Sequence, residues 1–190
     1  MQNIAIFASG NGSNAQTIAE FFRNHPGIRV SLILTNNPEA YVIRRAAILE
    51  IPSYIFNRET LYQTSRIGDL LKEKEITLIV LAGFLWMVPP NLVEAYPDRI
   101  VNIHPALLPR FGGKGMYGRH VHEAVLQSGC KESGITIHLV NNRYDEGDIL
   151  FQASCPVLPG DTPDTLAERI HLLEHRHYPE VIERLLSNPN

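Results

Sequence analysis

Cysteine and long apolar runs are both scarce in this chain. Two cysteines, Cys130 and Cys155, occur in 190 residues, which is too few for the disulfide framework of a small secreted domain. The first nine residues contain neither a basic segment nor a long apolar one, so they do not resemble a secretory signal peptide. No apolar run approaches the roughly 20 residues that a membrane-spanning helix needs. These absences predict a protein of the reducing cytoplasm with no membrane partner.

The chain also has no large excess of positive or negative charge. Seventeen lysines and arginines face twenty aspartates and glutamates, the formal net charge is −3, and no block of like charge occurs. A nucleic-acid-binding protein usually carries a broad basic surface, so we expect small-molecule partners and no nucleic acid. Hydrophobic residues make up 44% of the chain, and a chain of this length buries around 70% of its unfolded surface. We therefore expect one domain over residues 1–190. A monomer or weak homodimer is also expected, but not from these numbers.

Short apolar runs alternate with segments of helical periodicity in the first hundred residues. Four runs are typical of strands buried on both faces of a parallel sheet: Asn3–Ala8, Val30–Leu34, Leu78–Leu81 and Ile100–Ile103. Helices are expected between them, over Ser13–Phe22, Tyr41–Leu49 and Thr60–Lys74. This pattern predicts an α/β fold: an open, mostly parallel twisted sheet with a Rossmann-like N-terminal half and helices on both faces.

The pattern changes after Pro109. A glycine-rich loop is followed by a helix from about His120 to Gln127, by two strands at Ile135–Val140 and Ile149–Cys155, and by a last helix from about Pro163 to Leu186. No repeat or low-complexity segment interrupts the chain. We expect two halves of one domain, about 1–100 and about 101–190.

A glycine-rich turn, SGNGSNA at residues 9–15, follows the first expected strand. It matches a loose dinucleotide fingerprint, and such a turn directs backbone N–H groups and a helix N-terminus at an anion. NAD binding also calls for an acidic residue after the second strand, where this chain has Thr-Asn-Asn at 35–37. The favoured interpretation is a phosphate monoester held by Gly12, Ser13 and Asn14. The alternative is a plain helix cap with tight-turn glycines.

The stretch VNIHP at 101–105 places Asn102 and His104 at the end of an expected central strand. Side chains alternate along a strand, so both should point to the same side. Ligands of open α/β sheets bind at the carboxyl ends of the strands, and Pro105 ends this strand. An amide and an imidazole can stabilise one developing oxyanion and supply a proton. A histidine held by local hydrogen bonds is the alternative.

An acidic turn, YDEGD at 144–148, could supply a carboxylate to that histidine. Spacing alone does not choose among Asp145, Glu146 and Asp148, and an Asp-rich turn is common without any function. Eight histidines raise the question of a metal. The expected helix places His177 off the face of His171 and His175, and no cysteine cluster accompanies them, so we expect no metal site.

Several segments resemble the formyltransferase domain that uses 10-formyltetrahydrofolate as co-substrate. They are LAGFLWMV at 81–88, NIHPALLP at 102–109, GITIHLV at 134–140 and YDEGDIL at 144–150. SGNGSN at 9–14 and LLEHRHYP at 172–179 resemble the branch of this family that formylates glycinamide ribonucleotide. The resemblance covers nearly the whole chain. It implies a one-carbon transferase of de novo purine synthesis.

The resemblance also implies roles for individual residues. The catalytic group would be Asn102, His104 and Asp145, with Asp145 keeping His104 protonated. Gly12, Ser13 and Asn14 would hold the ribotide phosphate in the first half, and Glu174 would bind the glycinamide amine. The second half would be catalytic and folate-binding. Folate contacts, largely through main chain, would involve Leu85, Trp86, Met87, Val88, Asn102, Val140, Asn141 and Arg143, with Arg58 meeting the glutamate tail. The family often has an arginine where Trp86 stands.

The loop RFGGKGMYGR at 110–119 directly follows NIHPALLP and contains four glycines. We interpret it as a mobile lid whose Arg110, Lys114 and Arg119 could meet anionic ends of the ligands. An inert surface insertion is the alternative.

Two other functions share some of these features. Relatives that formylate initiator tRNA or hydrolyse formyl folate have the same catalytic triplet. They generally carry an additional domain, for which 190 residues leave no room. A non-enzymatic nucleotide-binding module would use the glycine-rich turn alone.

Overall fold

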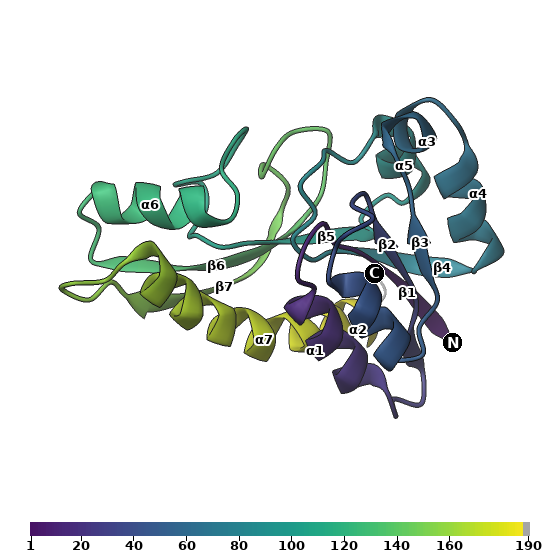
Figure 1. Ribbon diagram of the computed structural model, residues 1–190, viewed down its shortest axis with the longest axis horizontal. Coiled ribbons are helices and arrows are strands. Elements are labelled where there is room, and N and C mark those ends of the chain that lie inside the picture. Colours follow the sequence, from purple (N-terminus) through teal and green to yellow (C-terminus); the bar gives the residue numbers. More distant parts are fainter. Residues whose placement is uncertain (188–190) are drawn as a thin grey trace.

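The computed structural model describes residues 1–187, which form one seven-stranded sheet in the order β3-β2-β1-β4-β5-β6-β7 (Figure 1). The strands are β1 Gln2–Phe7, β2 Ile28–Thr35, β3 Ser53–Ile55, β4 Ile76–Leu81, β5 Ile100–His104, β6 Glu132–Leu139 and β7 Ile149–Pro156. Strands β1 to β5 pair in parallel. β6 runs antiparallel to β5, and β7 antiparallel to β6. The expected open, mostly parallel sheet is confirmed.

Helices cover both faces of this sheet, as expected. They are α1 Ser13–Phe22, α2 Val42–Ile48, α3 Arg58–Tyr62, α4 Arg66–Glu73, α5 Pro90–Ala95, α6 Arg119–Gln127 and α7 Pro163–Ser187. Alternate residues of β1 point to opposite cores: Ile4 and Ile6 pack with α1, α2 and α7, whereas Ala5 and Phe7 pack with α3, α4 and α5. Both faces of the central strands are therefore buried, which explains their continuous apolar runs.

The strand order reverses between β1 and β4. From β1 the chain builds outward through β2 to β3, and it then returns to place β4 and β5 on the other side of β1. The loops after β1 and β4 consequently leave the sheet in opposite directions and open a crevice at its carboxyl edge. The structure thus provides a binding position where the sequence places the glycine-rich turn.

Three short features differ from the sequence-based expectation. Strand β3 and helix α5 were not expected, because three and six residues are too few to show a periodicity. The helix expected over Thr60–Lys74 is divided into α3 and α4. Between them, the Thr64 hydroxyl donates to the Thr60 carbonyl and accepts from the N–H of Arg66. Such local side-chain bonds compete with continued helix.

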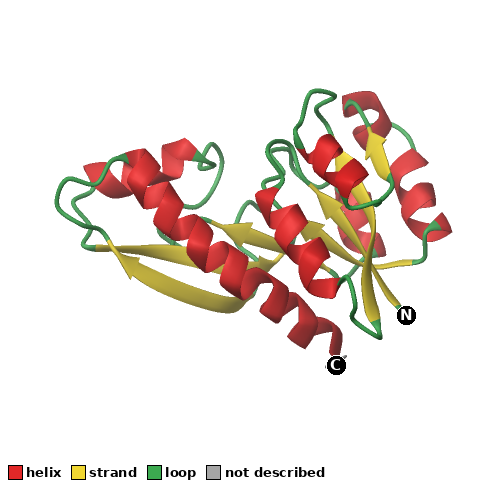
Figure 2. Cartoon of the chain, turned by 60° about the horizontal axis from the view of Figure 1, so that its bottom comes forward, coloured by secondary structure: helices red, strands yellow, loops and turns green. Residues whose placement is uncertain are grey.

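The long helix α7 ties the two halves together, as Figure 2 shows by its course across the sheet. Tyr178 is fully buried, and its hydroxyl group lies within hydrogen-bond distance of two carbonyl oxygens. The distances are 2.9 Å to Leu81 and 3.1 Å to Val101. These carbonyls belong to β4 and β5, so the helix is fixed directly behind the carboxyl edge. No helix within residues 1–187 combines the length and apolar character that crossing a membrane requires.

Candidate active site

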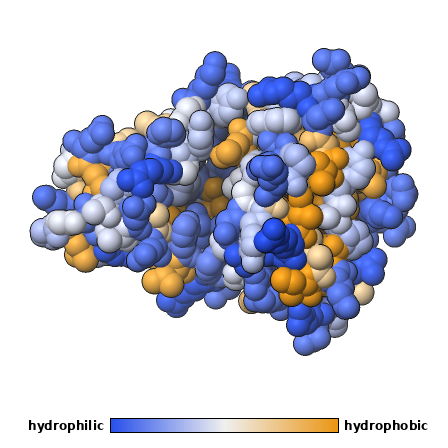
Figure 3. Space-filling model, viewed as in Figure 1, coloured by the Kyte–Doolittle hydropathy of each residue, from blue (hydrophilic) through white to orange (hydrophobic). Residues whose placement is uncertain are grey.

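A cleft of about 520 Å³ opens at the carboxyl edge of the sheet, and Figure 3 shows the molecule hollowed there. Its walls come from the turn after β1, the segment after β4, the end of β5, the loop before α6, the β6–β7 connection and α7. It gathers nearly all of the candidate residues: Gly12, Ser13, Asn14, Leu85, Trp86, Met87, Val88, Asn102, His104, Val140, Asn141, Arg143, Asp145 and Glu174. Segments far apart in sequence thus meet in one cavity.

The glycine-rich turn presents the N-terminus of α1 to this cleft. Gly12 has a φ of 76°, and a Cβ added there would lie 2.6 Å from Val42 Cβ. A side chain at this position would force the turn away from α2, so glycine is required. Within the described residues no hydrogen bond uses the N–H of Ser13 or Asn14. These two donors and the positive end of the α1 dipole are available to an anion.

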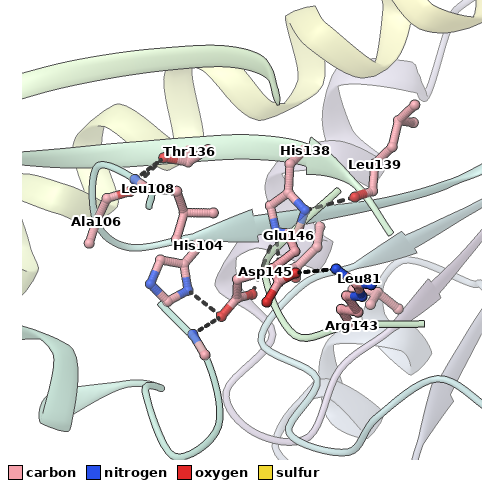
Figure 4. Close-up of polar contacts among 12 residues, drawn as sticks. Leu81, His104, Ala106, Leu108, Thr136, His138, Leu139, Arg143, Asp145 and Glu146 are labelled. Carbon is pink, nitrogen blue, oxygen red and sulfur yellow. Dashed lines mark hydrogen bonds and ion pairs between the residues drawn. The ribbon is translucent and has the colours of Figure 1, made fainter. Parts of the chain in front are cut away.

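Polar side chains of β5 and β6 form a hydrogen-bonded network at the floor of the cleft (Figure 4). Asn102 and His138 are paired across the two strands, and Asn102 Nδ2 lies 3.1 Å from His138 Nε2. His138 Nδ1 lies 2.8 Å from the Leu139 carbonyl oxygen, which can only accept. The ring proton is therefore on Nδ1, and Nε2 accepts from Asn102. The distance from His138 Nε2 to Asp145 Oδ1 is 3.6 Å.

His104 meets the same carboxylate from the other side. Its Nδ1 lies 3.6 Å from Asp145 Oδ2, and its Nε2 lies 2.7 Å from the carbonyl oxygen of Phe111. Because that carbonyl can only accept, Nε2 carries a proton and Nδ1 faces Asp145. Figure 4 shows Asp145 between the two imidazoles. The structure thus brings Asn102, His104 and Asp145 together, and it selects Asp145 among the three carboxylates of the acidic turn.

In the unliganded protein, the burial of His104 works against the expectation that Asp145 keeps this ring protonated. His104 is only 3% exposed, and this burial lowers its pKa below the ordinary value of 6.5, with His138 adding to the effect. The Asp145 charge and the Phe111 carbonyl act in the opposite direction and do not outweigh burial. Removing an ionised imidazole from water costs more here than one carboxylate returns. His104 is accordingly neutral near pH 7.

Asp145 remains ionised despite its own burial. Burial pushes the pKa of Asp145 upward, but the nearby His138 and His104 and the Gly113 N–H together hold it below the ordinary value. Its backbone has a φ of 55°, in the left-handed region that aspartate tolerates better than most residues. A Cβ added at Gly147 would lie 2.7 Å from the carbonyl carbon of Leu139. The turn is therefore packed tightly against β6, which positions Asp145.

A second buried carboxylate, Glu174 of α7, lies across the cleft. It is 7% exposed and accepts one hydrogen bond, from Asn14 Nδ2 at 2.8 Å. Burial raises its pKa, and the bond from Asn14 and the nearby His171 offset this only in part. A carboxylate this deep in the protein usually has several partners. Glu174 is thus suited to a ligand that brings hydrogen-bond donors or positive charge.

The segments expected to contact folate form the opposite wall. The cleft is lined by Leu85, Trp86, Met87, Val88, Val140, Asn141 and Arg143. Arg58 does not line it: its guanidinium lies over the Trp86 ring, 4.6 Å from the centroid. Arg58 therefore contacts a residue of the cleft wall without lining the cleft.

The glycine-rich loop at 110–119 is joined to the polar network through its main chain. The Phe111 carbonyl contacts His104, and the N–H of Gly113 donates to Asp145 Oδ2 at 2.9 Å. Of its three cations only Lys114 lines the cleft. Arg119 is paired with Glu123 and Asp164, and Arg110 contacts Cys130. The expectation that all three cations face the ligands is therefore not met in this conformation.

His138 is the member of the network that sequence reasoning missed. It lies in a segment that was recognised only as a family motif, and its place beside Asn102 depends on the antiparallel pairing of β5 with β6. The alternation of side chains along β6 could have indicated this position. His138 lies two residues beyond Thr136, which pairs with His104, so both side chains point to the same face.

His122 and His171 also line the cleft. Among residues 1–187 no group of three or more His, Cys, Asp or Glu side chains has metal-binding geometry. His171 and His175 lie side by side with ring centroids 6.3 Å apart, whereas His177 packs on Phe151.

His122 should make the fold sensitive to acid. It is buried, its Nδ1 has no partner among the described residues, and burial lowers its pKa to about 4, with His171 and His104 contributing. A lowered histidine pKa gives stability that is complete above the unfolded value of 6.5 and is lost as the pH falls toward 4. When the pH falls from 7 to 4, the unfolding free energy of wild type should drop by up to about 3 kcal/mol more than that of His122→Leu.

Urea titrations at several pH values measure this difference. His120→Gln, an exposed change on the same helix, is the control and should follow the wild-type curve. A His122→Leu curve parallel to wild type across this range would contradict the assignment.

Comparison with known proteins gives a consistent result. The family model described as formyl transferase matches residues 2–182. The chloroplastic phosphoribosylglycinamide formyltransferase of Arabidopsis thaliana is 42% identical over 187 residues, covering 95% of this chain and 64% of the relative. The chain likewise spans 61% of the chloroplastic enzyme of Vigna unguiculata, so both plant relatives are about half as long again. The phosphoribosylglycinamide formyltransferase of Bacillus subtilis is 36% identical, with 100% and 97% of the two chains covered.

Solved structures agree with the sequence relatives. The phosphoribosylglycinamide formyltransferase of Streptococcus pneumoniae superposes with a TM-score of 0.87 at 40% identity, covering 98% of this chain and 99% of the other. The protein of that name from Bacillus halodurans gives 0.88 at 37% identity, covering 100% and 97%.

Proposed function

Since the chain belongs to the formyl transferase family, we propose that it transfers a formyl group from 10-formyltetrahydrofolate to the amine of glycinamide ribonucleotide. The products are formylglycinamide ribonucleotide and tetrahydrofolate, and the reaction is a step of purine synthesis. One observation carries the proposal: a single cleft joins an anion-binding helix terminus, a buried carboxylate and the Asn102, His104 and Asp145 group. A simple nucleotide-binding module needs only the first of these.

The ribotide fits the side of the cleft formed by α1 and α7. Its phosphate would accept hydrogen bonds from the free N–H groups at Gly12, Ser13 and Asn14. Its glycinamide amine would donate to Glu174, whose hydrogen bond to Asn14 spans 2.8 Å. Because Asn14 touches both positions, the phosphate and the amine would be held at a fixed separation.

The formyl folate fits the opposite wall. The pterin would lie between residues 85–88 and 140–143, with contacts made largely by main chain. The guanidinium of Arg58 lies over the ring of Trp86. This cation would be close to the point where the anionic glutamate tail leaves the cleft. Arg58 can bind this tail without lining the cleft itself.

The reacting atoms would meet above Asn102 and His104. The amine nitrogen attacks the formyl carbon, a C–N bond forms, and the carbonyl oxygen becomes an oxyanion that Asn102 and His104 stabilise. Because His104 is neutral beforehand and its Nδ1 carries no proton, the proton released by the amine can pass to Nδ1, where Asp145 stabilises the imidazolium. The folate nitrogen then takes a proton through water as its bond to the formyl carbon breaks. Burial thus prepares His104 to change charge during the reaction.

The remaining expectations concern organisation and setting. We propose that residues 1–100 mainly bind the ribotide and that 101–190 are mainly catalytic and folate-binding, the final residues 188–190 lying outside the described part. Small-molecule partners without nucleic acid or membrane, no metal, a cytoplasmic location and a monomer or weak homodimer remain predictions.

A coupled assay tests the proposal against its alternatives. Purified protein is given formyl folate with and without glycinamide ribonucleotide, and both formylated ribotide and free formate are measured. Formyl transfer to the ribotide supports the proposal. Formate release independent of the ribotide would support a hydrolase, and nucleotide binding without either product would support a binding module.

Asn14→Ala should raise KM for the ribotide by about tenfold, with a smaller effect on formyl folate. The change removes the hydrogen bond to Glu174 and weakens the phosphate turn. Steady-state kinetics with each substrate varied in turn measure both constants. Equal weakening of the two substrates would argue against a ribotide site at α1.

Ligands should protect the loop at 110–119 from trypsin. Cleavage after Lys114 is expected to be fast in the free protein and clearly slower with ribotide plus a non-reactive folate analogue, because a closed lid is a poor protease substrate. The contacts of this loop with His104 and Asp145 support the lid interpretation. Unchanged cleavage with both ligands saturating would exclude it.

A further inference from the structure

His122 of α6 lines the cleft, yet the reaction described above gives it no role. Its side chain is buried, with 4% exposed, and within residues 1–187 neither ring nitrogen takes part in a hydrogen bond. Nδ1 is cut off from solvent, whereas Nε2 is not. Because His122 borders the cleft, Nε2 is the nitrogen that a bound ligand can reach.

The ring of His122 carries a single proton at neutral pH. Burial lowers the pKa of this ring to about 4, and the nearby His171 and His104 act in the same direction. In a neutral imidazole one nitrogen donates and the other accepts. A buried N–H without a partner is rarer than a buried acceptor without one, and Nδ1 is the buried nitrogen. The proton therefore lies on Nε2, and His122 presents an N–H donor to the cleft.

Neighbouring side chains locate this donor within the cleft. The charges of His104 and His171 both act on His122. His171 also acts on Glu174, which lies one turn further along α7. All four residues line the cleft. The donor therefore belongs to the part of the cleft that connects Glu174 with His104, the two residues that would meet the glycinamide amine.

The ribotide brings few hydrogen-bond acceptors to this part of the cleft. Its phosphate would bind at the N-terminus of α1, whereas its amine must lie near both Glu174 and His104. The amide carbonyl group is joined to the amine through a single methylene group, so its oxygen has to lie close by. The formyl oxygen is the other acceptor near the amine, and Asn102 and His104 already stabilise it. The amide carbonyl oxygen is thus the acceptor without an assigned partner.

We propose that His122 donates a hydrogen bond from Nε2 to the amide carbonyl oxygen of the ribotide. This inference rests on the proposed function and names the part of the substrate that α6 recognises. The bond restricts rotation of the glycinamide arm, so that the amine nitrogen is held toward the formyl carbon. It also selects amines that carry a carbonyl group next to the aminomethyl group. His122 is in this sense a residue that determines specificity.

A single-atom change in the ligand tests this bond. Binding of glycinamide ribonucleotide is compared with binding of its thioamide, in which sulfur, a weaker acceptor, replaces the carbonyl oxygen. Isothermal titration calorimetry at pH 7 measures both Kd values without turnover. Wild type should prefer the oxygen ligand by about threefold to tenfold, the range expected for one hydrogen bond.

Variants at position 122 separate the hydrogen bond from packing. His122→Leu should lose the preference for oxygen, and its kcat/KM for the ribotide should fall by a similar factor, with little change in KM for formyl folate. His122→Gln places an N–H near the position of Nε2 and should keep most of the preference. His122→Asn is equally polar but too short to reach, so it should lose the preference. The exposed change His120→Gln should alter neither Kd.

Circular dichroism verifies the fold of each variant, and the comparison of His122→Gln with His122→Asn decides the matter if His122→Leu does not fold. The inference is overturned if His122→Leu weakens both ligands equally, or if His122→Asn keeps the preference as fully as His122→Gln. Either result beside an active wild type would leave the proposed function intact. If wild type transfers no formyl group to the ribotide, the proposed function fails and this inference fails with it.

Discussion

Asp145→Asn should lower kcat by about two orders of magnitude or more. The carboxylate lies 3.6 Å from both His104 Nδ1 and His138 Nε2 and accepts the N–H of Gly113. An asparagine occupies the same space, but it cannot stabilise an imidazolium at His104. Since burial already lowers the pKa of His104, losing the favourable charge of Asp145 would leave the ring unable to take up the amine proton.

The neighbouring carboxylate is a matched control. Glu146 is exposed and pairs with Arg143 at 3.2 Å, on the outside of the same turn. Glu146→Gln removes an equal charge one residue away and should change kcat by less than about twofold, as expected for an exposed pair. Single-turnover kinetics of both variants separate the chemical step from product release. A damaging Glu146 change beside a mild Asp145 change would mean that the wrong carboxylate has been assigned.

Glu174→Gln should weaken the enzyme and strengthen the fold at the same time. Glutamine can still accept the hydrogen bond from Asn14, but it offers no charge to the amine of the ribotide. A hydrogen bond to a charged group contributes about 1.5 to 3 kcal/mol, so kcat/KM for the ribotide should fall by about 10- to 100-fold. KM for formyl folate should change little, because the segments proposed to bind folate are not those that hold Glu174 and Asn14.

The gain in stability follows from the direction of the pKa shift. Burial raises the pKa of Glu174 above 4.5, so the folded state holds this proton more tightly than the unfolded state. The associated stability is complete below pH 4.5 and is lost as the pH rises through the folded-state pKa. At pH 7 the variant avoids that loss, and its Tm should rise by roughly 2 to 4 °C, the response of a domain of this size to about 1 kcal/mol.

Calorimetry at pH 7 and pH 4 tests both the gain and its origin. The difference in Tm between variant and wild type should shrink at pH 4, where the wild-type carboxyl is protonated and resembles an amide. Glu168→Gln, an exposed change on the same helix, should alter neither Tm nor kinetics. A lower Tm for Glu174→Gln at pH 7 would show that the unliganded protein stabilises the charge of Glu174. The argument that this carboxylate binds an amine would then fail.

Sequence reasoning succeeded where the information is local. The buried strands are recognisable as apolar runs, and the alternation of side chains along β5 is enough to place Asn102 and His104 on one side of the strand. It was less successful where the information lies in pairing between strands. His138 joins the network only because β6 runs antiparallel beside β5, a relation that no spacing within one segment reveals.

Charge states were the hardest feature to predict. A carboxylate near a histidine suggests a raised pKa, and the resemblance to a known family led to the same expectation. The answer depends on how much water reaches the ring, and His104 is 3% exposed. Burial is a property of the whole fold, since β5, β6 and the loop at 110–119 together exclude the solvent. The same limit hid the contact between Arg110 and Cys130, which are twenty residues apart.

The position of α7 has a consequence for synthesis of the protein in the cell. Its hydrogen bond from Asn14 to Glu174 joins residues 160 apart, and Tyr178 reaches back to carbonyls 97 and 77 residues earlier. Among the described elements this helix leaves the ribosome last, yet it covers the core of β1, β4 and β5. A nascent chain paused before residue 163 would expose that apolar face, and such species are prone to aggregate. Translation must therefore run through α7 before the nascent protein can bury the core on this face of the sheet.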